Sequence, residues 1–191
     1  MPAANDTTRR WANQALAGSR EARDRLCECL VEPLRAFLVG SRLGLTPSEL
    51  NDALQETFLR LFERLDRLEQ AEAPTSYALG VARHVALDRL RNRERAKPLQ
   101  GPALERVADP TDVVAAVAGH EQAALVRETL DALDPEQRAV LTLRHINGLT
   151  MSQLASCLEC SVPTARSRLR SASRALAGAL LQRGVWPREG K

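Results

Sequence analysis

Aromatic residues and strand-forming patterns are scarce in this chain. Its 191 residues include two Trp, one Tyr and three Phe, so aromatics make up 3% of the sequence. No run of alternating β-branched residues occurs, and the dominant residues, Ala, Leu, Arg and Glu, are those that favour helices. The composition therefore predicts an all-α fold and argues against a protein built on a β-sheet.

Long apolar runs are also missing. The longest purely apolar run, Val113–Ala118, has six residues, whereas a membrane-spanning helix needs about 20. The N-terminal residues MPAANDTTRR lack the apolar core of a signal peptide. We therefore expect a cytoplasmic protein with no membrane insertion of its own.

Catalytic and metal-binding motifs are few. Cys157 and Cys160 have the C-x-x-C spacing, but no second pair and no His cluster completes a four-ligand zinc site. The other two cysteines, Cys27 and Cys29, are expected to be packing residues. There is no Gly-rich phosphate loop and no H-E-x-x-H motif. The sequence predicts no enzyme activity, no cofactor and no metal site, and it leaves a redox role for Cys157 and Cys160 open.

The charge is distributed unevenly, although the net charge is only +3. Arg83–Lys97 holds six basic and two acidic residues, and Ser161–Arg183 holds five arginines and no acid. Between them, Glu105–Glu136 has eight acids against two arginines. Two separate basic patches indicate two contacts with nucleic acid. The acidic stretch suits either a basic channel or an ordinary solvated surface.

The N-terminal half has the pattern of three long helices, which predict a first domain over residues 10–97. The first helix is expected at about Arg20–Gly40. The second begins after Thr46, where the segment TPSE forms a capping box with Pro at the first helical position, and continues to about Leu68. The third begins near Thr75 and ends in the basic segment RNRERAK.

A proline-rich segment separates this domain from a second one, expected over residues 113–183. Lys97–Pro110 contains three prolines and a glycine, which is typical of a flexible linker, and we place the linker at residues 98–112. A helix is expected from about Asp112 towards Leu133. Another runs from Asp134 to the stop signal Asn147-Gly148.

The segment Thr150–Leu176 predicts a helix-turn-helix. Thr150 begins a capping box for the first helix, and Ser161 offers an N-cap for the second, with Pro163 in its first turn. The second helix carries four arginines and no acid. A short helix, a tight turn and a basic second helix are the layout of a DNA-binding motif. The inward stripe of the second helix is expected to be Ala165, Leu169, Ala172 and Leu176.

Two helical domains in this order, joined by a linker, resemble the sigma factors of bacterial RNA polymerase, in the small extracytoplasmic-function (ECF) group of the sigma-70 family. The match covers roughly Arg20–Lys97 and Glu121–Leu181. Its most specific segments are DALQETFLRLFERL (Asp52–Leu65), ARHVALDRLRNR (Ala82–Arg93) and LDPEQRAVLTLRHINGLTMSQLA (Leu133–Ala155).

The resemblance implies a factor that binds core RNA polymerase and directs promoter-specific transcription initiation, typically of a stress or envelope-signal regulon. Its contacts on the polymerase would be the β′ clamp helices and the β flap. In the family, the helix that matches Asp52–Leu65 docks on the clamp helices. From the residues alone, an ordinary solvated surface with i,i+4 ion pairs is the favoured interpretation, and the resemblance reverses this preference. The matching residues are Asp52, Gln55, Glu56, Leu59, Arg60 and Glu63.

The segment Ala82–Arg93 resembles the part of the family that reads and melts the minus-ten promoter element. His84 stands where the family often has Asn, and Tyr77 where it often has Trp; both can still bond to or stack on a base. The arginines fit phosphate contacts. The loop Glu69–Pro74 matches the place where the family holds a flipped non-template base. The residues expected at minus-ten DNA are Tyr77, Arg83, His84, Asp88, Arg89, Arg91 and Arg93.

By the same resemblance, the second helix of the helix-turn-helix would enter the major groove at the minus-thirty-five element. Each of its arginines can hold a phosphate or read a base edge, and the sequence leaves both open. Ser171 and Ser173 stand where the family usually has further arginines. The residues expected at minus-thirty-five DNA are Thr164, Arg166, Ser167, Arg168, Arg170 and Arg174.

The resemblance also implies control in trans by an anti-sigma factor, which in this family is often anchored in the inner membrane. Apolar grooves that are exposed when the domains separate would give it a binding site. The free protein is expected to be a monomer. The alternative is a conventional helix-turn-helix regulator that acts without core polymerase. Such a regulator would need a dimer interface to match a palindromic operator, and no extended dimerisation helix is evident.

Overall fold

The computed structural model describes residues 2–96 and 127–183, which form helices joined by short turns, with no strand among them. The predicted all-α class is therefore confirmed. The predicted linker, residues 98–112, and the start of the helix expected from Asp112 lie outside the described residues. Residues 127–131 are helical. The other helices are α1 (Pro2–Leu16), α2 (Arg20–Gly40), α3 (Pro47–Phe62), α4 (Leu65–Gln70), α5 (Pro74–Ala96), α8 (Pro135–His145), α9 (Met151–Cys157) and α10 (Val162–Gln182).

Local capping explains where most of these helices begin. Capping boxes open α3 at Thr46 and α9 at Thr150, as predicted. The side chains of Asp134 and Ser161 accept backbone N–H groups in the first turns of α8 and α10. The predicted starts of these four helices and the predicted helix-turn-helix are therefore confirmed.

Helix α1 was not predicted. It packs against α2 and α4, and the residues that it buries there are Thr8, Ala12 and Ala15. Thr8, Trp11, Ala12 and Ala15 fall at helical spacing, but Trp11 is the only large apolar residue among them, so the sequence signal for this helix is weak.

The prediction of one helix from Thr46 to Leu68 was wrong. The chain leaves the helical conformation at Arg64 (φ −134°, ψ 43°), and a short helix, α4, follows. Leu65 and Leu68 are buried after this break, and α4 packs against α1. Because of this turn, Leu65 and Leu68 do not extend the buried face of α3 but belong to a helix that packs against α1. The apolar spacing in the sequence nevertheless continues through the break.

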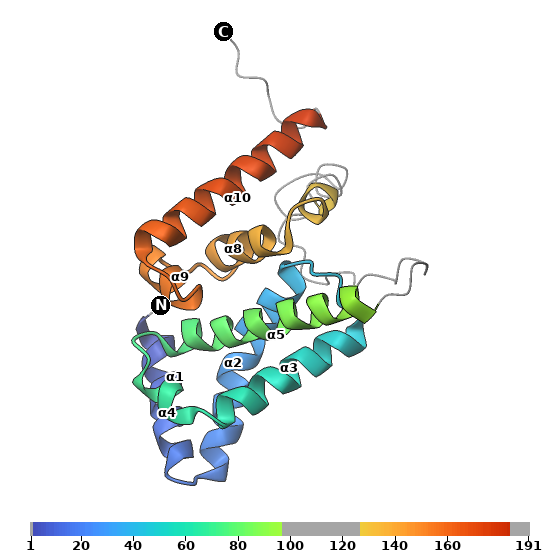
Figure 1. The fold of residues 1–191 in the computed structure, drawn as a ribbon. Coiled ribbons are helices and arrows are strands. Elements are labelled where there is room, and N and C mark those ends of the chain that lie inside the picture. The colour runs from blue at the N-terminus through green and yellow to red at the C-terminus, as the bar shows by residue number, and fades with distance from the viewer. Residues whose placement is uncertain (1, 97–126, 184–191) are drawn as a thin grey trace.

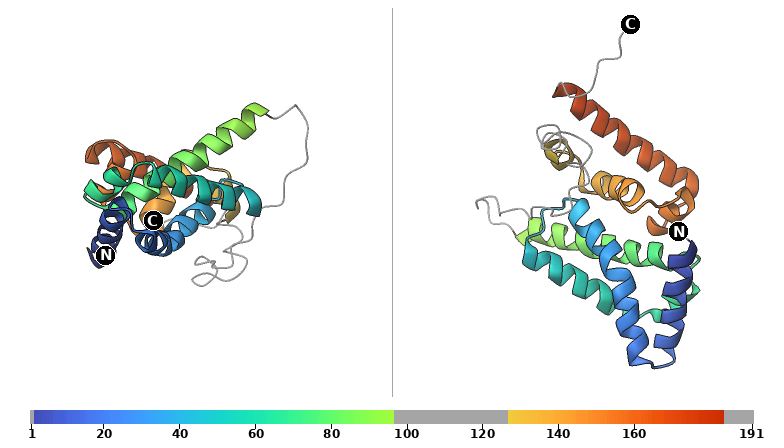
Figure 2. Two further views of the ribbon diagram at one scale, coloured as in Figure 1. Left: turned by 90° about the horizontal axis from the view of Figure 1, so that it is seen from below. Right: turned by 180° about the vertical axis from the view of Figure 1, so that it is seen from behind.

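The described helices form an N-terminal module (α1–α5) and a C-terminal module (residues 127–183) that pack against each other (Figures 1 and 2). Helix α5 contacts both α8 and α9, and α2 contacts α8. A side chain at Gly80 would meet the backbone of Cys157, because its Cβ would lie 3.2 Å from the Cys157 carbonyl oxygen. One hydrophobic cluster includes buried residues of both modules. Within the described part of the chain, no helix is long and apolar enough to cross a membrane.

Candidate nucleic-acid and polymerase interfaces

The first half of α10 presents a positive face to solvent. All six residues expected at minus-thirty-five DNA are exposed there, whereas Ala165 and Ala172 are fully buried against the rest of the module. The four arginines, 166, 168, 170 and 174, have no hydrogen bond or ion pair with any residue that the structure describes. An uncompensated cluster of this kind suits DNA phosphates.

The turn before α10 fixes its N-terminus. Glu159 adopts a left-handed conformation (φ 50°) between α9 and α10, and the Cys160 N–H donates to the Ala155 carbonyl at 3.0 Å. The Ser161 side chain accepts the Thr164 N–H, and the two hydroxyls lie 2.8 Å apart. Thr164 is therefore already part of the helix cap, so the arginines are the freer groups on this face.

The outward face of α3 combines acids with one exposed leucine. Leu59 is 64% exposed, and Asp52, Gln55 and Glu63 are exposed as well. A single exposed leucine is common on protein surfaces, so the case for docking here rests on the resemblance of Asp52–Leu65 to the family segment that binds polymerase.

The other two residues expected at the polymerase are bound within the N-terminal module. Glu56 Oε1 accepts from Arg60 at 2.6 Å. Glu56 Oε2 accepts from Arg89 Nη2 at 2.7 Å and from Nε at 3.0 Å. Glu56 thus joins the predicted polymerase face on α3 to the predicted DNA-reading helix α5.

The C-terminal module packs against the part of α5 that is expected to contact minus-ten DNA. The Arg83 side chain is 7% exposed and pairs with Glu136 in the first turn of α8. Arg91, two turns along α5, lies 3.6 Å from the same carboxylate. His84 Nε2 lies 3.4 Å from a carboxylate oxygen of Glu159. In this arrangement, acids of the C-terminal module face three of the residues expected to contact minus-ten DNA.

The remaining residues expected at minus-ten DNA are held within the N-terminal module. Arg93 donates to the carbonyl oxygens of Gly44 (2.6 Å) and Leu43 (3.4 Å), so it fixes the turn between α2 and α3. Tyr77 is half-buried against the core. Asp88 pairs with Arg91 at 3.2 Å. In this structure Arg83, Arg89 and Arg93 are thus bound to other groups of the protein. The phosphate contacts expected of them stay a prediction.

Polar contacts that the sequence did not reveal complete the interface between the modules. Arg42 donates two hydrogen bonds of 2.9 Å to the carboxylate of Asp131. The Asn147 side chain donates to the Pro33 carbonyl at 3.0 Å. The only sequence signal for this interface was the acidic stretch before α8, which contains Asp131 and Glu136. The two modules are thus in contact in this structure.

The comparisons with known proteins cover both modules. A model described as Sigma-70 region 2 matches residues 31–96, and one described as Sigma-70, region 4 matches residues 123–176. The ECF RNA polymerase sigma factor SigC of Mycobacterium tuberculosis is 32% identical over 127 residues, which are 66% of this chain and 67% of SigC. The chain belongs to the sigma-70 family, in its extracytoplasmic-function group.

Other similar proteins are a longer sigma factor and a solved complex. The probable RNA polymerase sigma factor RfaY of Xanthomonas campestris pv. campestris is 32% identical over 176 residues, which are 88% of this chain but 43% of RfaY. The co-crystal structure of the sigma factor RpoE with the anti-sigma factor NepR from Bartonella quintana matches with a TM-score of 0.57 at 18% identity. That likeness covers 82% of this chain and 95% of the RpoE chain, and it supports the fold.

Two further features of this ECF sigma factor bear on the predicted sites. Burial raises the pKa of the Cys157 thiol to about 12, so at neutral pH the group is the protonated thiol, which is a poor metal ligand. Among residues 2–96 and 127–183, no group of three or more His, Cys, Asp or Glu residues is arranged to hold a metal ion.

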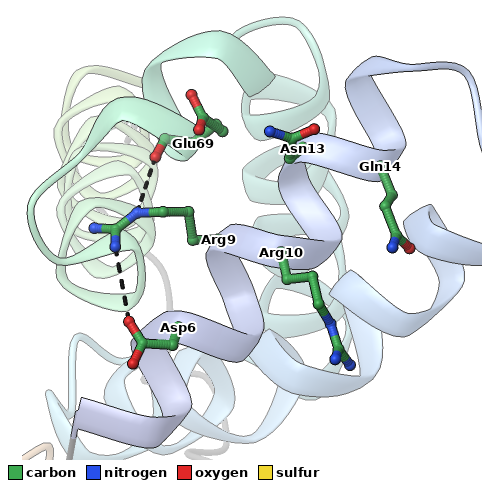
Figure 3. Close-up of a pocket in the computed structure, with 6 residues that line it drawn as sticks. All are labelled: Asp6, Arg9, Arg10, Asn13, Gln14 and Glu69. Atoms are coloured by element: carbon green, nitrogen blue, oxygen red, sulfur yellow. Dashed lines mark hydrogen bonds and ion pairs between the residues drawn. The ribbon is translucent and has the colours of Figure 1, made fainter.

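In the N-terminal module, α1 lies outside the region 2 match, and beside it is a polar pocket of about 370 Å³ lined by residues such as Arg9, Asn13 and Glu69 (Figure 3).

Proposed function

We propose that this protein binds core RNA polymerase and directs it to promoters, with no catalysis of its own. The observation that carries the proposal is that one chain, matched by both sigma-70 region models, exposes Leu59 among polar residues on α3 and an unpaired positive face on α10. The first would dock on the β′ clamp helices through Leu59 and its polar neighbours. The second would read the minus-thirty-five element, while the β flap supports the C-terminal module. Because polymerase is its partner, we place its action in the cytoplasm.

Run-off transcription tests this function directly. Core polymerase with the purified protein is expected to give defined transcripts on genomic fragments, whose start sites then reveal the promoters. Core alone is the control. Transcripts no different from those of core alone would overturn the proposal. A dimer that binds a palindromic site without polymerase would favour the conventional regulator instead.

The arginines on the positive face of α10 can be divided by experiment into those that hold phosphates and those that read bases. Replacing an arginine that holds a phosphate should weaken binding to all sequences and lower the salt slope by about 1. Replacing one that reads a guanine should cost about 1–3 kcal/mol and relax specificity at one base pair. Arg166→Ala, Arg168→Ala, Arg170→Ala and Arg174→Ala, each titrated with minus-thirty-five duplexes at several salt concentrations, separate the two roles.

The proposed function also requires the two modules to separate before α5 binds promoter DNA. Arg83 is buried against Glu136, and His84 faces Glu159, so α5 would present its full face to DNA only after α8 and α9 move away. We propose that the closed arrangement is the resting form and that core polymerase stabilises the open one. An anti-sigma factor, like the NepR bound to RpoE in the similar complex, would act on the same equilibrium. Membrane anchoring of that partner stays a prediction.

A further inference from the structure

Helix α1 holds the end of α4 and the residues that follow it. The guanidinium of Arg9 donates through Nε to the Glu69 carbonyl at 3.3 Å. Through Nη2 it donates to the carbonyls of Ala71 (2.9 Å) and Glu72 (3.1 Å). The last carbonyls of a helix lack partners within it, so one arginine here satisfies three acceptors of a turn.

The same face of α1 holds the start of α5. The Asn5 side-chain oxygen accepts the backbone N–H of Thr75 at 3.3 Å. Thr75 lies in the first turn of α5, whose N–H groups have no partners within the helix, so Asn5 acts as a cap supplied by a different helix. Asn5 and Arg9 are four residues apart and thus on one side of α1. Between them they fix both ends of the connection from α4 to α5.

The surroundings of Arg9 keep its side chain directed at this connection. Asp6, one turn earlier, lies 3.7 Å from Arg9. Figure 3 shows Arg9 between Asp6 and the backbone of Glu69, with Arg10 pointing to the other side of α1. Since the fork of a guanidinium is rigid, three hydrogen bonds from it define the position of the backbone that accepts them.

We propose that Asn5 and Arg9 are positioning residues for minus-ten recognition. In this proposal, α1 holds the segment Glu69–Pro74, which contains the end of α4 and the connection to α5, in the shape that captures an unpaired base of the non-template strand. The inference rests on the proposed function. A loop that is ordered in advance loses less entropy on binding, and a displacement of about 1 Å is enough to spoil selective contacts. Without α1, the loop would sample other shapes and accept different bases more equally.

Holoenzyme made with core polymerase tests the inference on a promoter first mapped with the wild-type protein. Templates carry each of the four bases at each minus-ten position, and the rate of run-off transcription is measured on each. We expect Arg9→Gln to reduce the base preference at one position about tenfold, while the preferences at the other positions and in the minus-thirty-five element persist. Asn5→Leu should act in the same direction. Asn5→Asp keeps the acceptor and should keep the preference.

Arg25→Gln is the matched control. Arg25 is an exposed arginine on α2 that pairs with Glu28 three residues on, as Arg9 pairs with Asp6, but it does not bond to the loop. This variant should retain every base preference.

Two results would overturn the inference. One is full base preference in both Arg9→Gln and Asn5→Leu. The other is an equal loss of rate on all templates, which would indicate a stabilising role only. If the wild-type protein supports no transcription, the proposed function itself fails, and that outcome is distinct from either of these.

Discussion

Arg83 is buried at the contact between the two modules. A buried guanidinium is costly unless its N–H groups are paired, and Arg83 has one carboxylate partner, Glu136, while its Nε has no hydrogen-bond acceptor. The same side chain is expected to contact DNA. Glu136 therefore occupies the place that a phosphate would take, and the strength of this pair helps to set how readily α5 becomes available.

Glu136→Ala tests this competition. Because the Glu136 side chain is 41% exposed, its loss should cost less than the ~3–5 kcal/mol of a fully buried pair. We expect about 1.4 kcal/mol in favour of the open form, or roughly tenfold tighter binding of a minus-ten single-stranded oligonucleotide by the free protein, measured by fluorescence anisotropy. Glu128→Ala is the control, because Glu128 is 70% exposed and contacts Arg183 instead. Equal affinities for Glu136→Ala and wild type would show that Glu136 does not restrain α5.

We expect the Cys157 thiol to make the free energy of unfolding depend on pH in the alkaline range. Burial raises its pKa to about 12 in the folded state, whereas an unfolded thiol titrates at about 8.5. Above pH 8.5 the unfolded chain binds fewer protons than the folded one. The free energy of unfolding should therefore fall as pH rises towards 12, by at most about 1.4 kcal/mol per pH unit. Denaturant titrations from pH 7 to 10 should show this extra slope in the wild type and not in Cys157→Ala. Identical slopes would contradict the prediction.

At the scale of elements, sequence signals worked where local chemistry determines the structure. Thr46, Thr150 and Ser161 could be identified as helix caps because capping involves residues three apart in sequence. The break at Arg64 was missed because no Gly or Pro marks it and the apolar spacing runs through it. Helix α1 was missed because its buried side chains are small. A local pattern cannot reveal a helix whose stability comes mainly from its packing against α2 and α4.

The candidate sites likewise include features that local sequence predicts and features that depend on long-range packing. The exposed faces of α3 and α10 could be predicted because helical spacing determines which residues point outward. The pairing of Arg83 with Glu136, 53 residues apart, could not, because it depends on how two modules meet.

The face of α3 yields a direct prediction about polymerase binding. Leu59→Asp removes an apolar side chain that is 64% exposed, so the stability of the free protein should change by less than about 0.5 kcal/mol. Affinity for core polymerase should fall at least tenfold, because burying a leucine contributes about 1.5–3 kcal/mol. Fluorescence titration with core polymerase measures this. Leu16→Asp on α1, where Leu16 is 48% exposed, is the matched control. An equal loss of affinity in both variants would argue against α3 as the docking surface.

At the scale of the whole molecule, the closed form combines ion pairs with apolar packing. The Arg42–Asp131 pair and the Arg83–Glu136 pair both join the modules. Between α5 and α9 the backbones approach closely at Gly80 and Cys157. Because both pairs are partly buried, high salt weakens them less than it weakens exposed pairs, and it does not weaken the apolar contacts. The two modules are therefore expected to stay together in salt, and to separate when a partner binds or when a substitution removes the Arg83–Glu136 pair or the close packing.

Gly80→Leu supplies such a substitution. The Cβ of the new side chain would lie 3.2 Å from the Cys157 carbonyl oxygen, and its remaining atoms would need space that α9 now fills. Gly178→Leu on α10 is the matched control, since nothing lies within 4 Å of its Cβ. Both changes raise helix propensity by about 1 kcal/mol, so this effect cancels in the comparison. We expect Gly80→Leu alone to increase the radius of gyration in small-angle scattering and to speed alkylation of Cys157. If Gly80→Leu scatters and reacts like Gly178→Leu, then close packing of α5 on α9 does not hold the modules together, and the resting form must depend on the ion pairs instead.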